Sequence, residues 1–187
     1  MVNISFNDTT KKILKSLVGK EFESYTCDSF VFSPTVFGII GLNISGETYR
    51  ITCDISSIER FFSKEDVAIL SFERCLPNDI CSRMDNGKMI KNPIKDTIKR
   101  IDIVNDLEAV THNNEEKTLY STKGIIFYLT SGNEISFEVS TWFSELITIQ
   151  KGYNLISKFT PVLDFYEEWD RENGYIPICK REITTIT

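Results

Sequence analysis

Apolar and polar residues alternate over several short stretches of the chain, as they do in β-strands that bury one face. In "GIIGLNISGETYRITCD", residues 38–54, the pair Ser45 and Gly46 separates two such runs. Glycine tolerates the positive φ that a tight turn requires, so this stretch predicts a β-hairpin. The apolar face of its second strand consists of Tyr49, Ile51, Cys53 and Ile55. The polar face is expected to meet solvent and consists of Thr48, Arg50, Thr52 and Asp54.

A similar hairpin pattern returns in "GIIFYLTSGNEISFEVS", residues 124–140. Residues 38–72 and 124–158 align without a gap and are identical at seven of 35 positions, where typical residue frequencies would give about two. In the second hairpin the inward positions are expected to be Ile135, Phe137 and Val139. The outward positions are expected to be Glu134, Ser136 and Glu138. The alignment favours an internal duplication, and the alternative is two hairpins that obey the same turn rules.

Helical spacing appears at two other places in the chain. Apolar residues within 9–18 predict a short amphipathic helix that Gly19 ends. Pro161 is expected to open a second helix over 161–173, because apolar residues recur there at helical spacing. The stretch "SSIERFF", residues 56–62, resembles a helical turn.

Further strands are predicted over 20–26, 67–73 and 175–186. Pro177 suits an edge strand, because proline has no N–H to donate to a neighbour. Residues 77–96 are rich in turn residues and predict a linker or a long connection.

Together these elements predict an α+β fold dominated by β-structure, with two similar antiparallel β-sheet modules and a few peripheral helices. The N-terminal module with its leading helix is expected over residues 1–86. A basic connecting segment follows over 87–102, and the C-terminal module with its helix and final strand occupies 103–187.

Composition narrows the class of protein. With 41% hydrophobic and 26% charged residues the chain is typical of a folded globular protein. Its net charge of −6 argues against a general nucleic-acid binder. No apolar run is long enough for a membrane helix and no signal peptide is evident. Five cysteines, an odd number, favour free thiols in a reducing cytoplasm.

Known catalytic and cofactor motifs are missing from the sequence. His112, the one histidine, lies in a polar turn where solvation is the better explanation than catalysis. Neither a nucleophile elbow nor a glycine-rich phosphate loop occurs. Glu59 and Glu145 occupy matched positions of the two hairpin copies and could form a carboxylate pair. Capping-box spacing from Ser56 accounts for Glu59 without any catalysis.

Metal and redox chemistry find little support in the sequence. Cys75 and Cys81 lack the second close pair that a structural zinc site needs, so we expect no metal and no cofactor. Two unrelated free thiols are the favoured interpretation of this pair, and a disulfide or redox pair is the alternative.

Two stretches are candidate binding surfaces. The most basic stretch could contact nucleic-acid phosphates, or could be a solvated linker, and contains Arg83, Lys88, Lys91, Lys95, Lys99 and Arg100. If the stretch around Lys91, Lys95 and Lys99 is helical, these three lysines share one face. A second stretch is both acidic and aromatic, which suits contact with another protein, and contains Tyr166, Glu167, Glu168, Trp169 and Asp170. Its apolar residues could instead belong to the core.

The segment "GIIFYLTSGNEISFEVSTWFSELITIQKGYNLISKF", residues 124–159, resembles small acidic proteins carried by mobile elements of low-GC Gram-positive bacteria. Some proteins of that setting inhibit bacterial defence systems, including anti-CRISPR proteins. The resemblance implies a non-enzymatic inhibitor that binds a defence nuclease or ribonucleoprotein, and it transfers no site residues. A nucleic-acid-binding module and a hydrolase that uses unrecognised carboxylates are the alternative functions.

Overall fold

The computed structural model describes residues 1–29, 34–84, 87–169 and 173–187. Its strands are β1 (Val2–Ile4), β2 (Glu21–Asp28), β3 (Thr35–Phe37), β4 (Ile39–Ile44), β5 (Glu47–Arg60), β6 (Ser63–Arg74), β7 (Met89–His112), β8 (Glu115–Leu129), β9 (Glu134–Val139), β10 (Leu146–Gly152) and β11 (Ile176–Ile186). Its α-helices are α1 (Asp8–Leu17) and α2 (Leu163–Glu167). Its short 3₁₀ helices are η1 (Pro77–Asp79) and η2 (Leu155–Lys158).

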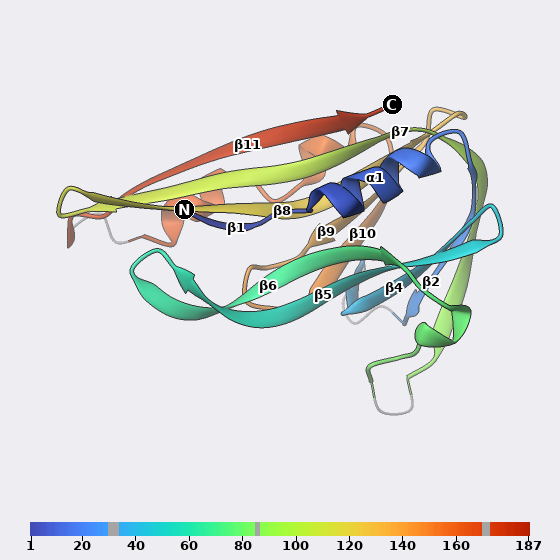
Figure 1. Ribbon diagram of the computed structural model, residues 1–187, viewed down its shortest axis with the longest axis horizontal. Coiled ribbons are helices and arrows are strands. Elements are labelled where there is room, and N and C mark those ends of the chain that lie inside the picture. The colour runs from blue at the N-terminus through green and yellow to red at the C-terminus, as the bar shows by residue number, and fades with distance from the viewer. Residues whose placement is uncertain (30–33, 85–86, 170–172) are drawn as a thin grey trace.

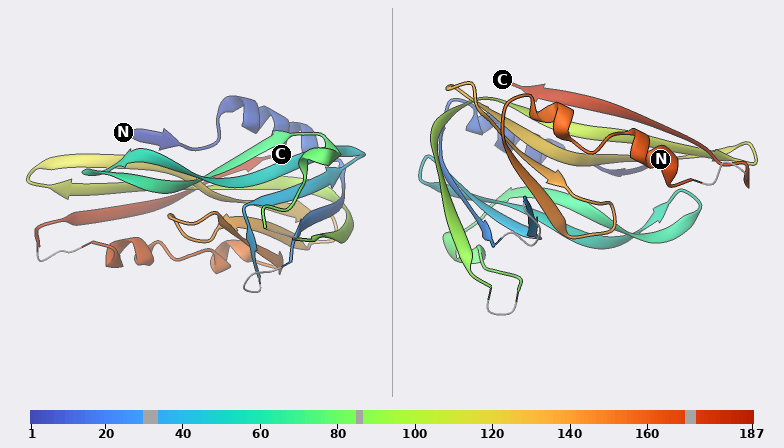
Figure 2. Two further views of the ribbon diagram at one scale, coloured as in Figure 1. Left: turned by 90° about the horizontal axis from the view of Figure 1, so that it is seen from below. Right: turned by 180° about the vertical axis from the view of Figure 1, so that it is seen from behind.

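Within the described residues the eleven strands form one sheet that folds over into two layers (Figure 1). The strand order is β3-β10-β9-β8-β7-β2-β4-β5-β6, with β1 parallel to β8 and β11 antiparallel to β7. One layer holds β2, β4, β5 and β6, and the other holds β8, β9, β10 and β11 (Figure 2). Antiparallel pairing predominates because most neighbouring strands are joined by short turns.

Strand β7 forms the corner between the layers because it belongs to both. Its first part, 89–97, pairs with β2, and its second part, 98–112, pairs with β8, while β11 takes the opposite edge of 101–111. The register with β2 shifts opposite Phe22 and Ser24, and Lys95 has a positive φ of 57°. Such bulges bend and twist a strand. The 24-residue strand can therefore turn from one layer into the other.

The main core lies between the two layers and against α1. Phe22 of β2 packs on Phe127 of β8 with ring centroids 5.3 Å apart, and Tyr25 packs on Phe137 of β9 at 6.0 Å. Leu14 and Leu17 of α1 join the same cluster and are fully buried. Burial of these large aromatic and aliphatic side chains is the principal force that holds the layers together.

A further segment of the chain covers the outer face of the strand layer that contains β8 and β9 (Figure 2, right). We call residues 153–169 the cover segment, which contains η2 and α2. Phe159 of this segment packs on Val104 and Ile126, and Phe165 packs on Val110 and Leu119. The expectation that the polar face of the second hairpin meets solvent was therefore wrong. Ser136 and Glu138 are buried beneath the cover segment, 2% and 4% exposed.

Both predicted hairpins are present. The first is β4–β5 with Ser45 and Gly46 in its turn, and the second is β8–β9. Their matched glycines have different structural roles, however. Gly38 has a positive φ of 55°, whereas a Cβ on Gly124 would lie 2.5 Å from the Phe137 carbonyl oxygen and 2.7 Å from the Phe159 ring. The shared glycine is thus explained by local geometry in each hairpin, and the internal duplication stays a prediction.

Other predicted elements had mixed outcomes. The first helix is confirmed as α1, whose N-terminus is capped by the Asn7 side chain that accepts the Thr10 N–H. The helical turn at 56–62 was wrong, because β5 continues to Arg60 in unbroken pairing with β6. The linker at 77–96 was wrong from Met89 onward, where β7 begins. Of the helix expected over 161–173, Leu163–Glu167 is α-helical, and residues 170–172 lie outside the described residues.

The dominance of β-structure is confirmed. The described strands form one sheet, in which β1 and β3 of the first predicted module pair with β8 and β10 of the second. Most of the basic segment 87–102 is strand, since residues 89–102 form the first part of β7. No helix among the described residues is long and apolar enough to cross a membrane.

Candidate functional site: a charged cavity under the cover segment

A cluster of buried charges lies between the strands and the cover segment. Alternation along each strand places Asp106 and Glu108 of β7, Lys123 of β8, Glu138 of β9 and Arg181 of β11 on the outer face. Register brings them together, because β11 pairs Arg181 with Asp106 and Cys179 with Glu108. The three carboxylates are only 3–4% exposed. Buried charges of this kind must be paired, hydrogen-bonded or neutralised.

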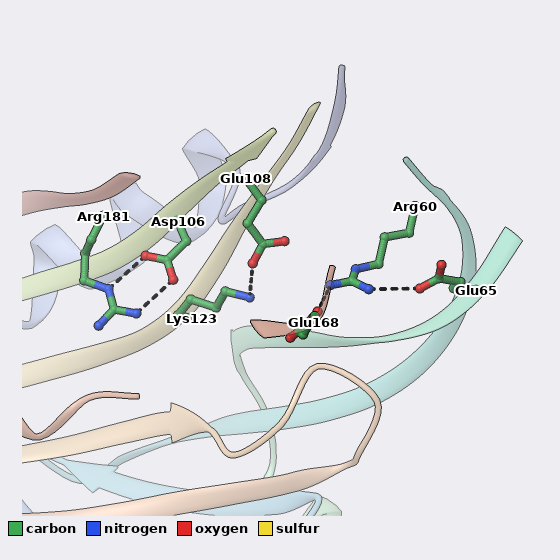
Figure 3. A network of polar contacts seen from close by, with 7 residues as sticks. All are labelled: Arg60, Glu65, Asp106, Glu108, Lys123, Glu168 and Arg181. Atoms are coloured by element: carbon green, nitrogen blue, oxygen red, sulfur yellow. Dashed lines mark hydrogen bonds and ion pairs between the residues drawn. The ribbon is translucent and has the colours of Figure 1, made fainter. Parts of the chain in front are cut away.

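Two ion pairs form the floor of the cluster (Figure 3). Arg181 holds Asp106 in a fork, with Nε and a terminal nitrogen each 2.8 Å from a carboxylate oxygen. The Lys123 Nζ lies 2.7 Å from the Glu108 Oε1. A two-bond guanidinium–carboxylate contact fixes the orientation of both side chains and is stronger than a single hydrogen bond. The floor is therefore a preorganised set of charges.

Arg60 at the end of β5 ties the hairpin tip to the cover segment. Its guanidinium lies 3.0 Å from Glu65 and 2.7 Å from Glu168, and it stacks 3.9 Å from the centre of the Trp142 ring. Figure 3 shows Arg60 between the two carboxylates. The residue is 4% exposed, so these contacts form in a desolvated environment where they are stronger than on the surface.

Glu138 differs from the other carboxylates because it belongs to no ion pair among the described residues. One of its oxygens accepts the Thr160 N–H at 2.7 Å. Burial raises the pKa of the Glu138 carboxyl above its usual value, an effect that the Thr160 hydrogen bonds and Arg181 oppose. Proximity to Asp106 acts in the same direction as burial. Glu138 is thus the carboxylate whose charge is least compensated.

The two ion pairs of the floor and Glu138 line a cavity of about 310 Å³. Its charged lining consists of five carboxylates (Asp106, Glu108, Glu138, Asp164 and Glu168) and two cations (Lys123 and Arg181), a formal charge of −3. Trp142, Phe143 and Phe165 supply aromatic walls. The size falls within the range of ligand pockets, and polar groups converging in a mostly apolar pocket are typical of such sites.

A metal ion fits the same floor less well. One donor atom each from Asp106, Glu108 and Cys179 lies within 4.8 Å of the others. Both carboxylates are, however, already held by Arg181 and Lys123. Burial raises the pKa of the Cys179 thiol to about 12, so the thiolate that a metal prefers is disfavoured.

A larger cavity of about 580 Å³ lies between α1 and the β5–β6 hairpin. Its charged residues pair with one another, Arg50 with Glu73 at 2.6 Å and Arg83 with Asp54 at 2.7 Å. These side chains are partly exposed, between 29% and 52%. Surface pairs of this kind are common without any ligand. The smaller cavity, with its buried charges, is therefore the stronger candidate site.

Most residues of the predicted acidic and aromatic surface make contacts within the protein. Tyr166 packs against the small apolar cluster around Phe165, and its hydroxyl accepts the Cys179 N–H at 3.2 Å. Trp169 packs on Phe61 at 5.2 Å, and Glu168 pairs with Arg60. Glu167 is exposed, and Asp170 lies outside the described residues. Contact of this surface with a partner stays a prediction.

The predicted basic residues divide into two groups. Arg83 pairs with Asp54 and, at 3.4 Å, with Glu145, whereas Arg100 stacks 3.7 Å from the centre of the Tyr128 ring. The remaining residues are exposed, belong to no ion pair among the described residues, and are Lys88, Lys91, Lys95 and Lys99. The helix that would have placed Lys91, Lys95 and Lys99 on one face is not formed, since residues 91–99 lie in β7.

The predicted carboxylate pair is not brought together. Glu145 lies beside Arg83, which also contacts the Cys53 carbonyl. Glu59 lies six residues beyond Cys53 along β5, about 20 Å at ~3.3 Å per residue. Cys75 and Cys81 are both free. His112 stacks 4.1 Å from the Tyr175 ring and hydrogen-bonds with Asn113, a structural environment.

The buried charges of the cavity escaped sequence reasoning, although part of the signal was present. In "IDIVNDLEAV", residues 101–110, Asp102, Asp106 and Glu108 alternate with apolar residues. That pattern alone predicts a wet face. Only the register of four strands and the position of the cover segment convert these carboxylates into a buried cluster.

One edge of the sheet is open beside this cavity. β11 pairs with β7 along all of 176–186, and no other described strand pairs with it. The Cys179 N–H points to Tyr166, hence away from β7. Because amide directions alternate along a strand, the N–H groups of Arg181, Ile183 and Thr185 also point outward. Ile183 is 48% exposed.

Comparison of the chain with protein-family models, with curated proteins and with solved structures finds no match.

Proposed function

We propose that the protein is a non-enzymatic binding protein that pairs the free edge of β11 with an extended segment of another protein. The single observation that carries the proposal is the open edge from Arg181 to Thr185. Strand addition to such an edge satisfies unpaired backbone groups and gives affinity through main-chain hydrogen bonds. Side chains on alternate positions then provide specificity.

The backbone groups on the free edge of β11 are blocked near Pro177 and available near Thr185. This difference limits where along β11 a partner strand can pair. The backbone nitrogen of Pro177 lies on the open side of β11 but has no N–H to donate. The N–H of Cys179 on the same side donates to the Tyr166 hydroxyl. Beyond these two positions the outward groups have no described partner. Exposed Ile183 supplies an apolar contact at the centre of the open stretch. A partner segment of about five residues would therefore cover 181–185.

The resemblance of residues 124–159 to mobile-element proteins gives this proposal a partner class. The partner would be a nuclease or ribonucleoprotein of a bacterial defence system, and the chain would act as its inhibitor. The net charge of −6 supports such a partner, because proteins that bind nucleic acid present basic surfaces.

The test uses two variants at one position. Ile183→Pro removes an outward N–H and leaves the bonds to β7 in place, whereas Ile183→Thr keeps the N–H and changes only the side chain. Affinity purification from the native host with the wild type and Ile183→Thr should give the same stoichiometric partner, and Ile183→Pro should lose it. In the purified complex the 181, 183 and 185 amides should become protected from hydrogen exchange. A complex that forms equally well with Ile183→Pro would refute strand addition.

Nucleic-acid binding is the second candidate, favoured by the exposed lysines in β7 and directly before it. If Lys88, Lys91, Lys95 and Lys99 contact phosphates, the logarithm of affinity should fall with the logarithm of salt at a slope of about −3 to −4. A titration of a labelled oligonucleotide at several salt concentrations measures this slope. No binding at low salt would eliminate the candidate.

A further inference from the structure

The cavity under the cover segment contains more negative than positive charge, and three of its carboxylates are buried. Five carboxylates and two cations line it, and the two cations are already engaged by Asp106 and Glu108. Glu138 forms hydrogen bonds with the backbone and the side chain of Thr160 and feels the charge of Arg181, but it belongs to no ion pair among the described residues. A buried carboxylate without a counter-ion is costly unless it is protonated or meets a cation.

A second feature lies beside the cavity. The Ser121 hydroxyl is buried and has no hydrogen-bond partner in the part of the chain that the structure describes. Ser121 is 5% exposed and lies opposite Asp106 in the β7–β8 ladder, so it shares the outer face with the cluster. It lines a separate, narrow void of about 10 Å³, which shares Glu108, Lys123, Val139 and Trp142 with the lining of the cavity. Buried hydroxyls are normally satisfied, so an orphaned one needs an explanation.

Arg60 shows how an aromatic residue of the cavity lining contacts a cation. The Arg60 guanidinium stacks on Trp142 and meets Glu168, a residue of the cavity lining. Aromatic faces attract cations because of the ring quadrupole, and the attraction grows when both are desolvated. Trp142, Phe143 and Phe165 therefore offer a second cation the same kind of contact that Arg60 makes.

We propose that this cavity binds a small organic cation, an alkylguanidinium or a primary alkylammonium group, with Glu138 as its counter-ion. The aromatic walls would enclose the alkyl portion. The group could belong to a free metabolite or to an arginine or lysine side chain of a protein. The inference does not depend on strand addition at β11, because it rests on side chains of the cavity and not on the free backbone groups of β11.

The experiment begins with calorimetric titration of wild-type protein with ethylguanidinium and n-butylammonium chlorides, beside the neutral analogues ethylurea and n-butanol. We expect at least one cation to bind with a dissociation constant of about 1 mM, the order that so small a ligand can reach. The neutral analogues should bind at least tenfold more weakly. Absence of binding by both cations, or equal binding of the neutral analogues, would overturn the proposal.

A matched pair of variants on β9 locates the site. Glu138→Gln removes the charge and keeps an oxygen for the Thr160 N–H, so affinity should fall at least tenfold. The control is Glu134→Gln, whose carboxylate accepts the Leu155 N–H at the same 2.7 Å but does not line the cavity. Its affinity should equal that of the wild type. Equal loss in both variants, or in neither, contradicts the assignment of Glu138.

An amide NMR spectrum of the wild-type protein gives an independent measure that needs no variant. Ligand should shift the Thr160 amide, which bonds to Glu138, more than the Leu155 amide, which bonds to Glu134. Shifts confined to amides outside the cavity would also overturn the proposal.

The source of the cation is distinguished by capped tripeptides, Gly-Arg-Gly and Gly-Lys-Gly. If either binds at least as tightly as the matching free cation, the site accepts a protein side chain. If the free cations bind and both peptides fail, the site takes a free metabolite. Both results support the cation site and assign its source.

Discussion

Arg60 offers the sharpest test of how the cover segment is held. We predict that Arg60→Met destabilises the protein by about 2 kcal/mol. Two charge-assisted hydrogen bonds are worth about 1.5–3 kcal/mol each when buried. The side chains of Glu65 and Glu168 keep 24% and 32% exposure, which reduces each to about 1 kcal/mol. Loss of the stacking on Trp142 adds about 1 kcal/mol. Relief of the desolvated guanidinium, whose Nε has no partner among the described residues, offsets about 1 kcal/mol.

Methionine keeps most of the volume of the arginine stem, so the change reports on the charge contacts more than on packing. Equilibrium urea denaturation measures the free energy of unfolding, and the thermal midpoint should fall by about 4–8 °C for a chain of this size. Amides of the cover segment should also exchange faster, since Glu168 loses its anchor.

The control lies on the same strand. Arg50 of β5 pairs with Glu73 at 2.6 Å, but both side chains are partly exposed, 33% and 51%. Arg50→Met should therefore cost no more than about 0.5 kcal/mol. If the two variants destabilise the protein equally, burial does not strengthen the Arg60 contacts and the reasoning is wrong.

Three further predictions concern other parts of the fold. Gly124→Ala should destabilise the protein by about 3 kcal/mol or more in urea denaturation, because its Cβ would meet the Phe137 carbonyl at 2.5 Å. Gly132→Ala has open space and only an unfavourable φ of 91°, so it should cost about 1 kcal/mol; equal costs would contradict the steric argument. Burial raises the pKa of the Glu138 carboxyl, so its contribution to stability is present below the unfolded pKa and is lost as pH rises through the folded pKa. The wild type should gain stability relative to Glu138→Gln on acidification through this window, and parallel pH profiles would refute the shift. In an assay of thiol reactivity on the native protein, the exposed Cys81 should react first. Burial raises the pKa of Cys27 to about 11 and the pKa values of Cys53 and Cys179 to about 12, so these thiols should react only after unfolding. Fast reaction of all five cysteines would contradict this burial.

Local signals predicted several elements because their physical causes are local. A turn glycine with alternating flanks specified both hairpins, and helical spacing before Gly19 specified α1. Pro177 correctly indicated an edge strand. The same local reasoning failed over 56–62, where capping residues lie within the long β5 strand, because pairing with β6 outweighs local preference.

The sequence by itself determined that this chain is rich in β-strands, where its tight turns lie, and which residues are apolar enough for a core. Only the tertiary structure decided that β7 bends to join two layers of one sheet and that a cover segment lies over the polar face of β8 and β9. The reason is that alternation fixes which side of a strand a residue occupies, but not what lies against that side. Asp106, Lys123, Glu138 and Arg181 come from four different strands, and long-range register and packing alone make them a buried charged cavity.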